Sequence, residues 1–306
     1  IDSIQTGWTA AGFDNDGDEA ILHLVSASGE KRSERGAIVI GADGIHSALR
    51  AQIAPDEGPP IWAGAVLLRG TTRAKPFKTG ASMVMVGHSR CRFVSYPISK
   101  IDPETGLATI NWIANLAYPA DAHWNKEDWN RRANLDDFLP RYTGWTFDWL
   151  NVPDLVLGAK EVFEYPMVDR DPLERWTHGR MTLVGDAAHA AYPVGSNGAG
   201  QAIVDARKLG RAFLDHGVTA DALQAYEAEM RPATTKVVLT NRTAGPDAIL
   251  DVIEERCGGE FESIEDVISR DELAGHANRY KAIAGFAVDA LNAAAPIIPE
   301  GARAAT

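Results

Sequence analysis

Cysteine is scarce in this 306-residue sequence, which contains only Cys91 and Cys257. Two cysteines so far apart lack the spacing of a metal site and cannot build the disulfide framework of a small secreted domain. Long apolar runs are also missing, because no uninterrupted stretch approaches the roughly 20 residues that a membrane-spanning helix needs. We therefore expect reduced thiols, no metal site and a soluble, cytoplasmic protein with no membrane partner.

Positive charge is scarce as well. The sequence has 30 Lys and Arg against 42 Asp and Glu, which gives a formal net charge of -12. Such a chain repels phosphate backbones, so nucleic acid is not an expected partner. The hydrophobic share of 45% and the charged share of 24% are typical of a globular enzyme with a real core, and the length suggests about two domains. The oligomeric state is not readable from these numbers.

Turn and strand patterns divide the chain. Strand-like runs alternate with turns at Asn15–Gly17 and Ser28–Gly29, and a buried strand is expected at 37–40. From residue 61 to 115, similar runs favour a largely antiparallel sheet. A helix is expected over 125–143, a short helix or loop over 145–157, a strand over 161–168, and mostly helix after 199. We predict four regions: 1–58, 59–168, 169–245 and 246–306.

The most informative stretch is RMTLVGDAAHAAYPVGSNGAGQAIVDA, residues 180–206. Its pattern predicts a buried strand, a tight turn at Gly185 that is followed by the Asp186 carboxylate, a glycine-rich loop and a helix. Asp186 could accept hydrogen bonds from sugar hydroxyls. Glycines at 195, 198 and 200 leave room for a ligand to approach the free N–H groups and positive dipole end of the helix. This order predicts a site for a phosphorylated cofactor.

A second motif, GADGIHSALR at residues 41–50, has the same order of a strand end, an acidic turn and a helix. A small-residue turn places Asp43 at the end of the strand expected at 37–40, just before a short helix. The run PDEGPP at residues 55–60 then interrupts both the helical and the strand periodicity, and it predicts a boundary between domains.

The ordered pair of motifs resembles the FAD-dependent aromatic hydroxylases, the single-component group that includes para-hydroxybenzoate hydroxylase. Within that group the stretches INWIANL, EDWN and YPMVDRDPLERW resemble the phenazine-modifying branch, the type of monooxygenase that makes pyocyanin. The resemblance runs from about Gly41 to Arg242. It implies an α/β fold with three parts: a partial FAD-binding (glutathione-reductase-like) domain that lacks its first βαβ unit, a mostly antiparallel-sheet substrate domain, and a helical C-terminal region.

The same resemblance implies cofactor-binding residues. Gly185 and Asp186 would hold the ribityl chain of FAD, and Asp43, Gly44 and Arg50 would lie close to the pyrophosphate and support the nicotinamide cofactor. The loop beside the flavin ring would consist of Pro193, Val194, Gly195, Ser196, Asn197 and Gly198. Because reduced flavin is negatively charged at this ring edge, the helix dipole would stabilise it.

The implied reaction is reduction of FAD by NADH or NADPH, formation of a flavin hydroperoxide with oxygen, and hydroxylation of a small aromatic substrate. Since flavin carries this chemistry, no catalytic side chain is assigned. Candidates for the substrate pocket are Arg69, Tyr96, Trp112 and Pro193, although Arg69 could form a salt bridge and the two strand aromatics could be core. His189 and Asn197 are interpreted as structural rather than catalytic.

The family's initial GxGxxG unit, which wraps the ADP half of FAD, is not present in the sequence. We therefore expect the chain to be a fragment and to bind FAD weakly by itself. Two alternatives stay open: a flavin oxidoreductase acting on another aromatic or polyketide substrate, and a non-catalytic remnant or partner-binding module. Trp145 and Trp149 only superficially resemble a flavin-halogenase motif, because their spacing differs.

Overall fold

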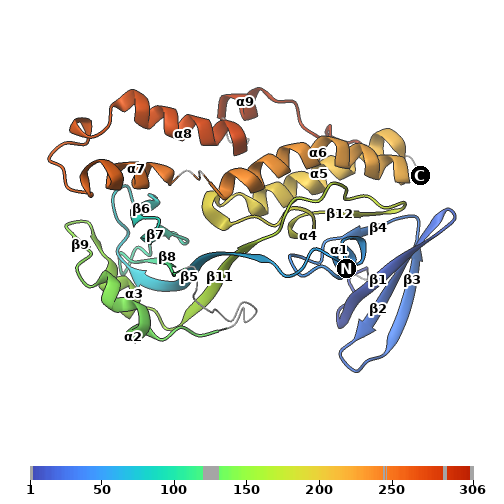
Figure 1. Cartoon of the computed structure of the whole chain (residues 1–306), viewed down its shortest axis with the longest axis horizontal. Coiled ribbons are helices and arrows are strands. Elements are labelled where there is room, and N and C mark those ends of the chain that lie inside the picture. Colours follow the sequence, from blue (N-terminus) through green and yellow to red (C-terminus); the bar gives the residue numbers. More distant parts are fainter. Residues whose placement is uncertain (1–2, 120–130, 244, 246, 285–287, 304–306) are drawn as a thin grey trace. The chain divides into compact units, whose positions relative to one another are not determined.

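A computed structural model describes residues 3–119, 131–243, 245, 247–284 and 288–303 (Figure 1). The chain divides into two compact units. Unit 1 comprises residues 1–61, 168–245 and 278–306, and unit 2 comprises residues 62–167 and 246–277. The predicted regions 1–58 and 169–245 fall within unit 1, whereas the predicted C-terminal region 246–306 is shared between the two units.

Unit 1 begins with a three-stranded antiparallel sheet in the order β1-β2-β3, followed by a parallel pair of short strands, β4 and β12. Its elements are β1 (Trp8–Asp16), β2 (Glu19–Ser26), β3 (Lys31–Gly36), β4 (Val39–Gly41), α1 (Ala48–Ile53), β12 (Met181–Leu183), α4 (Asp186–His189), η2 (Pro193–Gly195), α5 (Gly198–His216), α6 (Ala220–Asn241) and α9 (Val288–Ala293).

The core of unit 1 forms where β4 and β12 pack against α5 and α6, the two long helices that lie side by side in Figure 1. Leu183, Leu209 and Tyr226 are buried there. The buried residues of α5 include Asp205, Leu209 and Ala212, which recur at the spacing of one helix face. Thr219 caps the start of α6 by accepting a hydrogen bond from the Ala222 amide, 3.3 Å away.

Unit 2 is built on a five-stranded sheet in the order β11-β5-β8-β7-β6. Its elements are β5 (Ile61–Ala74), β6 (Val84–His88), β7 (Cys91–Pro97), β8 (Ala108–Ala117), α2 (Leu135–Phe138), η1 (Leu139–Tyr142), β9 (Thr146–Phe147), β10 (Leu150–Asn151), α3 (Val152–Leu157), β11 (Val162–Asp169), α7 (Ala248–Cys257) and η3 (Ile264–Asp266). Helix α8 (Arg270–Ala284) runs from residues of unit 2 into residues of unit 1.

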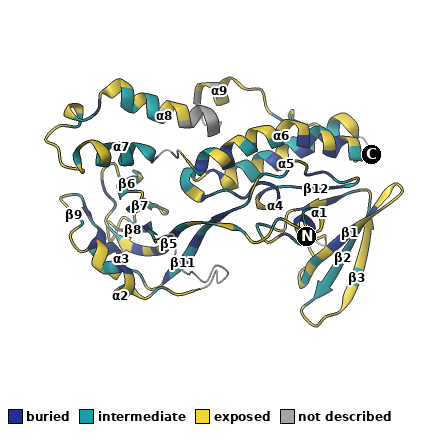
Figure 2. Cartoon of the chain, in the orientation of Figure 1, coloured by how far each residue is buried: buried dark blue, intermediate teal, exposed yellow. Residues whose placement is uncertain are grey.

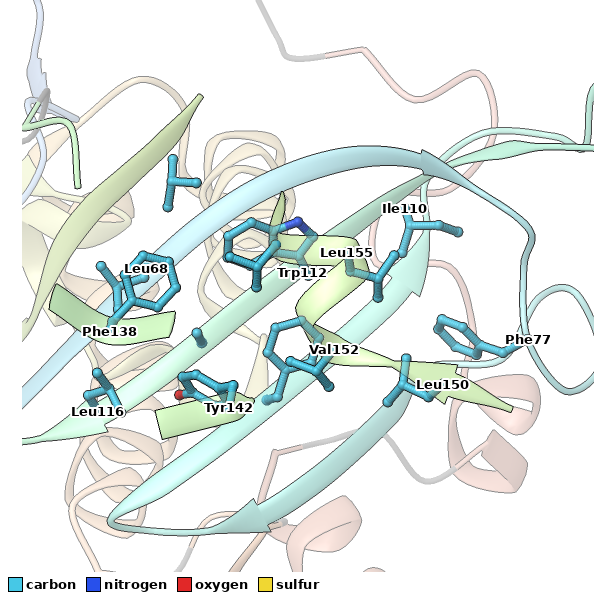
Figure 3. Close-up of a cluster of buried hydrophobic side chains, with 14 of the residues drawn as sticks. Leu68, Phe77, Ile110, Trp112, Leu116, Phe138, Tyr142, Leu150, Val152 and Leu155 are labelled. Carbon is cyan, nitrogen blue, oxygen red and sulfur yellow. The ribbon is translucent and has the colours of Figure 1, made fainter. Parts of the chain in front are cut away.

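Buried and exposed residues alternate along β5 from Leu68 to Arg73, so the two faces of the unit 2 sheet differ. Figure 2 shows the burial of each described residue on the cartoon. On one face, Leu68, Ile110 and Trp112 pack with residues of α2, η1 and α3 to form an apolar core (Figure 3). The opposite face carries Arg69, Thr71 and Arg73 of β5 and Thr109 and Asn111 of β8, and we call it the polar face. The antiparallel register of β5 and β8 pairs Arg69 with Ile113 and Arg73 with Thr109.

Part of the polar face is covered by the segment that starts at Asp247. Arg92 of β7 forms a buried ion pair with Asp247, and burial lowers the pKa of this arginine. The Ser89 amide donates to Asp251 Oδ1 of α7 at 2.8 Å. These contacts fix α7 against the β6–β7 hairpin and leave the β5, β8 and β11 part of the polar face to the cavity described below.

The sequence predictions for strands and turns are largely confirmed. The turns at Gly17 and Gly29 connect β1 to β2 and β2 to β3, and an antiparallel sheet follows. The strand expected at 37–40 is β4, but Ile40 is 41% exposed rather than buried, because side chains alternate along a strand and Val39 is the one that faces the core.

The helical regions are confirmed in part. Over the described part of 125–143, helix is limited to α2 and η1, while residues 125–130, including the stretch EDWN, lie outside the described residues. The region 145–157 contains both a small hairpin, β9–β10, and helix α3.

Gly70 of β5 gives a test of the unit 2 core. A Cβ at this position would lie 2.4 Å from Cζ2 of Trp112, whose ring is fully buried, stacked on Phe93 and hydrogen-bonded to Thr72. We expect Gly70→Ala to lower the free energy of unfolding by about 1–3 kcal/mol, since the ring has nowhere to move. Gly144→Ala, where a Cβ meets nothing within 4 Å, is the control. Urea unfolding that gives equal stabilities for both variants would contradict this packing.

Candidate functional site

The two sequence motifs meet at one edge of a parallel strand pair. Strands β4 and β12 align Val39 with Met181 and Gly41 with Leu183, so both strands end at the same level. Asp43 and Asp186 follow directly after these ends. In parallel sheets the carboxyl ends of strands form the edge at which ligands bind. The structure therefore places the two motif carboxylates at one such edge, in unit 1.

Gly185 makes the turn that follows β12. Its backbone has φ 58° and ψ -142°, a conformation that is strained for any residue with a side chain. Asp186 comes next, as the first residue of α4, and it is exposed while its neighbours on both sides are buried. Within the described parts of the chain its carboxylate has no hydrogen-bond or ion-pair partner. The turn thus presents an uncommitted carboxylate to solvent.

A buried polar pair lies behind this turn. Asp205 of α5 is 0% exposed, and its Oδ2 accepts a hydrogen bond from the Gly185 amide at 2.8 Å and lies 2.6 Å from His189 Nε2. His189 is the last residue of α4 and packs against the ring of Trp176. Burial, together with the charge of Asp205, raises the pKa of the Tyr226 phenol, which therefore stays neutral. Asp205 holds both ends of α4.

The glycine-rich loop leads into α5. Ser196 has a left-handed conformation, with φ 52° and ψ 30°, and Asn197 is buried at the start of the helix. Gly198 and Gly200 lie in the first turn of α5, and a Cβ at either position would meet nothing within 4 Å. The first N–H groups of a helix have no partner within it. The start of α5 consequently combines free donors with open space.

The loop is fixed at its beginning by three contacts. Asn241 Nδ2 donates to the Tyr192 carbonyl at 3.0 Å, the Arg170 amide donates to the Ala190 carbonyl, and the Tyr192 hydroxyl donates to the Ile61 carbonyl at 3.4 Å. Burial and the nearby Asp169 charge raise the pKa of Tyr192 to about 12, so its hydroxyl remains protonated. Pro193 follows as an exposed residue at the start of η2.

Asp43 and Gly44 shape the start of α1. Asp43 Oδ2 accepts hydrogen bonds from the Ala48 amide at 2.9 Å and the Leu49 amide at 3.5 Å. Gly44 has φ +78° and open space around it. The Asp43 carboxylate thus caps a helix, as Asp often does, and differs from Asp186, which has no such commitment.

Arg50 is buried and connects the two motifs. Its Nη1 donates to the carbonyls of Ala187 and Ala188 at 3.0 and 2.9 Å. Its Nε and Nη2 bind the Glu57 carboxylate, and Nη2 also donates to the Asp171 carbonyl at 2.6 Å. The guanidinium is 1% exposed, so it is not open to a ligand in this structure. It instead fixes α4 relative to α1.

Unit 2 contains a cavity of about 670 Å3 on its polar face. Arg69 lies within it, with Cζ 5.8 Å from the centre of the Tyr165 ring. The cavity is lined by residues of β5, β8 and β11 and of the loop before β11, namely Arg69, Gly70, Thr71, Thr72, Arg73, Thr109, Asn111, Gly158, Lys160, Glu161, Phe163 and Tyr165.

The other two substrate-pocket candidates of unit 2 lie apart from this cavity. Tyr96 is on the polar face, because the register of β7 and β8 pairs it with Asn111, but it is not among the residues that line the cavity. Trp112 points to the opposite face, where it is 0% exposed and stacked on Phe93 (Figure 3). Strand alternation assigns Trp112 to the core, so it does not line the cavity.

Sequence reasoning missed several residues of these arrangements. Asp205 could have been found, because it shares the apolar face of α5 with Leu209 and Ala212, and an acidic side chain on such a face implies a buried partner. Lys160, Phe163 and Tyr165 carry no such signal, since only the tertiary fold places them beside β5.

No cluster of His, Cys, Asp and Glu in the described ranges could hold a metal ion. Both cysteines are unpaired. Among the helices that the structure describes, none is both long and apolar enough to cross a membrane.

The comparisons with known proteins agree with this geometry. The family model "FAD binding domain" matches residues 150–241, which include β12, Asp186 and the glycine-rich loop. Phenazine 1,6-dicarboxylic acid hydroxylase PhzS of Lysobacter antibioticus is 41% identical over 79% of this chain and 60% of its own length. The 3-amino-4-hydroxybenzoate 2-monooxygenase PtmB3 of Streptomyces platensis is 32% identical over 76% of this chain and 58% of its own length.

The chain therefore spans about 60% of the length of the curated relatives it matches. In fold, it is similar to Klebsiella pneumoniae HpxO, solved in complex with FAD and uric acid, with a TM-score of 0.63 and 21% identity over 93% of this chain and 64% of that one. Over about three quarters of its length the chain is therefore similar in sequence to hydroxylases and monooxygenases of aromatic compounds, and residues 150–241 match an FAD binding domain.

Proposed function

We propose that this chain serves an FAD-dependent monooxygenase that hydroxylates an aromatic or phenazine-like substrate with oxygen and NADH or NADPH. The observation that carries the proposal is the exposed Asp186 carboxylate, which has no partner in the described part of the chain and is held at the carboxyl edge of the parallel strands β4 and β12. Unit 1 then corresponds to the ribityl and isoalloxazine side of a glutathione-reductase-like FAD domain, and unit 2 to the substrate domain.

The residues present fit the flavin half of FAD. Asp186 can accept hydrogen bonds from the ribityl hydroxyls, and the turn at Gly185, which needs a positive φ, orients it. The open space at Gly198 and Gly200 admits a flat ring edge to the first turn of α5. The free N–H groups and dipole of this helix stabilise negative charge on such an edge. Asp43 and Gly44, in the turn before α1, are the proposed contacts near the pyrophosphate and the nicotinamide cofactor, and the buried Arg50 supports the site by holding α4.

FAD, when bound, supplies the redox and oxygen chemistry of the reaction. The side chains of this chain bind and orient the cofactor and the substrate, and they exclude water from the site. Asp205 and Arg50 fix α4 so that Asp186 keeps its position, and Tyr192 with Asn241 fixes the loop that starts at Pro193. In unit 2, the cavity on the polar face supplies cations and aromatic walls for the substrate. Pro193 and Tyr96 remain candidates for further substrate contacts.

The names of the relatives support the substrate class. PhzS is named for an aromatic dicarboxylic acid and PtmB3 for an aminohydroxybenzoate. Both of these names describe planar aromatic acids. The cavity of unit 2 supports an aromatic substrate for this chain as well. The two unpaired cysteines suit a reducing compartment, so we place the activity in the cytoplasm.

The activity is tested with the chain supplied with FAD, NADH or NADPH and a panel of aromatic compounds. We expect NAD(P)H oxidation that depends on the aromatic compound, and incorporation of one oxygen atom from labelled O2 into the product. Oxidation of a substrate without oxygen transfer would instead favour a flavin oxidoreductase. Absence of both flavin binding and turnover, even after a GxGxxG-containing FAD-binding unit is joined to the chain, would favour a non-catalytic remnant or partner-binding module.

Asp186 gives a direct test of the flavin site. Asp186→Asn removes the charge but keeps the size, so we expect the Kd for FAD to rise about tenfold, because charge-assisted hydrogen bonds to the ribityl hydroxyls are lost. The change is measured by quenching of flavin fluorescence. Asp221→Asn, at an exposed position of α6, is the control and should leave the Kd unchanged. Equal FAD affinities of wild type and Asp186→Asn would refute the assignment.

Asp205 tests the support behind the turn. Asp205→Asn weakens the contacts to the Gly185 amide and His189, so we expect the free energy of unfolding to fall by about 1–3 kcal/mol, and FAD affinity to fall with it. Asp215→Asn on the same helix removes an exposed pair with Arg211, which should change stability by no more than about 0.5 kcal/mol. Thermal unfolding with and without FAD makes the comparison. A similar small effect for both variants would show that Asp205 does not hold α4.

A further inference from the structure

The cavity of unit 2 carries positive charge that the chain does not neutralise. Three cations line it, Arg69, Arg73 and Lys160, against one carboxylate, Glu161. Glu161 is paired with Arg132, whose Nη2 lies 2.5 Å from Glu161 Oε1. The cavity is therefore cationic, although the whole sequence has a formal net charge of -12.

The partners of the three cations differ. Arg73 is paired with Asp102 at 3.3 Å, but both side chains are well exposed, and such pairs are weak. Arg69 stacks on Tyr165, and neither Arg69 nor Lys160 has an anionic partner among the described residues. Two lining cations thus lack a counter-charge from this chain.

These two cations lie toward opposite ends of the cavity. Arg69 and Arg73 are on the same face of β5, four residues apart, which corresponds to about 13 Å along a strand. Arg69 is beside Tyr165. Lys160 belongs to the Arg73 end, because it lies two residues after Gly158, which packs against Thr72: a Cβ on Gly158 would lie 2.5 Å from Thr72 Cγ2. Cations near both ends of the cavity can each bind one anionic group of a single flat molecule.

The rest of the cavity lining is aromatic and polar. Phe163 and Tyr165 occupy the same face of β11 and form one wall, and Thr71 and Asn111 belong to neighbouring strands. The buried Nδ2 of Asn111 has no acceptor in the described structure, a need that a ligand acceptor can meet. A volume of about 670 Å3 is within the range of pockets for drug-sized ligands.

We propose that this cavity binds a planar aromatic dianion, with one anionic group on Arg69 and the other on Lys160 and Arg73. As the identity of the substrate, this rests on the proposed function. As a binding preference, it rests on the charges of the cavity alone. A ligand with one anionic group leaves one of the two cation sites without a partner, so the cavity distinguishes dianions from monoanions.

The test measures binding by calorimetry for three probes of the same ring system: phenazine-1,6-dicarboxylate, phenazine-1-carboxylate and phenazine. We expect the wild-type chain to bind the dicarboxylate at least tenfold more tightly than the monocarboxylate, and phenazine most weakly. Arg69→Gln and Lys160→Gln should each weaken dicarboxylate binding about tenfold and remove the preference for two carboxylates.

Two further variants control for net charge and folding. Lys100→Gln removes an exposed charge of unit 2 outside the cavity and should leave all three affinities unchanged. Arg69→Lys keeps the charge and should restore part of the affinity lost in Arg69→Gln, provided that thermal unfolding shows both variants folded. Equal binding of the dicarboxylate and the monocarboxylate by wild type, or an equal loss in Lys100→Gln, overturns the proposal.

The outcome is separable from that of the proposed function. A dicarboxylate preference without oxygen transfer, even when the chain is joined to a GxGxxG-containing FAD-binding unit and loaded with FAD, would refute the hydroxylase function and keep the binding site. Hydroxylation of aromatic compounds without a dicarboxylate preference would keep the function and refute the dianion site.

Discussion

A guanidinium buried in unit 1 sets the geometry on which the candidate flavin site depends. Arg50 is nearly inaccessible, and removing a charged group from water is costly unless all its donors are satisfied. Its nitrogens are satisfied by Glu57 and by three backbone carbonyls, two of which end the short helix α4. Because α1, α4 and the segment that follows β11 must all meet this one side chain, the two motifs cannot move independently.

The same principle operates on the other side of α4. Asp205 is a buried carboxylate, and its partners are the Gly185 amide and the His189 ring, at the two ends of that helix. A cation on one side and an anion on the other thus fix a four-residue helix whose first side chain is exposed. The physical consequence is that Asp186 is the group left for a ligand, while the charged residues around it are committed to the fold.

In unit 2, the two faces of one sheet have different roles. Alternation along β5 and β8 separates an apolar face, which packs under α2, η1 and α3, from a polar face with cations and hydroxyl groups. In a chain with excess negative charge, three cations gathered in a cavity, two of them without an anionic partner among the described residues, raise the local concentration of anionic ligands. The apolar face packs into a core that holds the sheet rigid, and the polar face carries the groups that recognise the ligand.

Local chemistry was enough to predict the strands, the turns at Gly17 and Gly29, the strand–turn–helix of residues 181–206 and the motif pair, since each depends on short-range spacing or backbone freedom. It did not reveal that Asp43 caps a helix, that Arg50 is buried, that Trp112 faces the core or that Lys160 joins Arg69 in one cavity. These depend on register and burial, because the face of a strand or the partner of a charge is decided by segments more than a hundred residues away in the chain, as in the contact of Arg50 with Ala187.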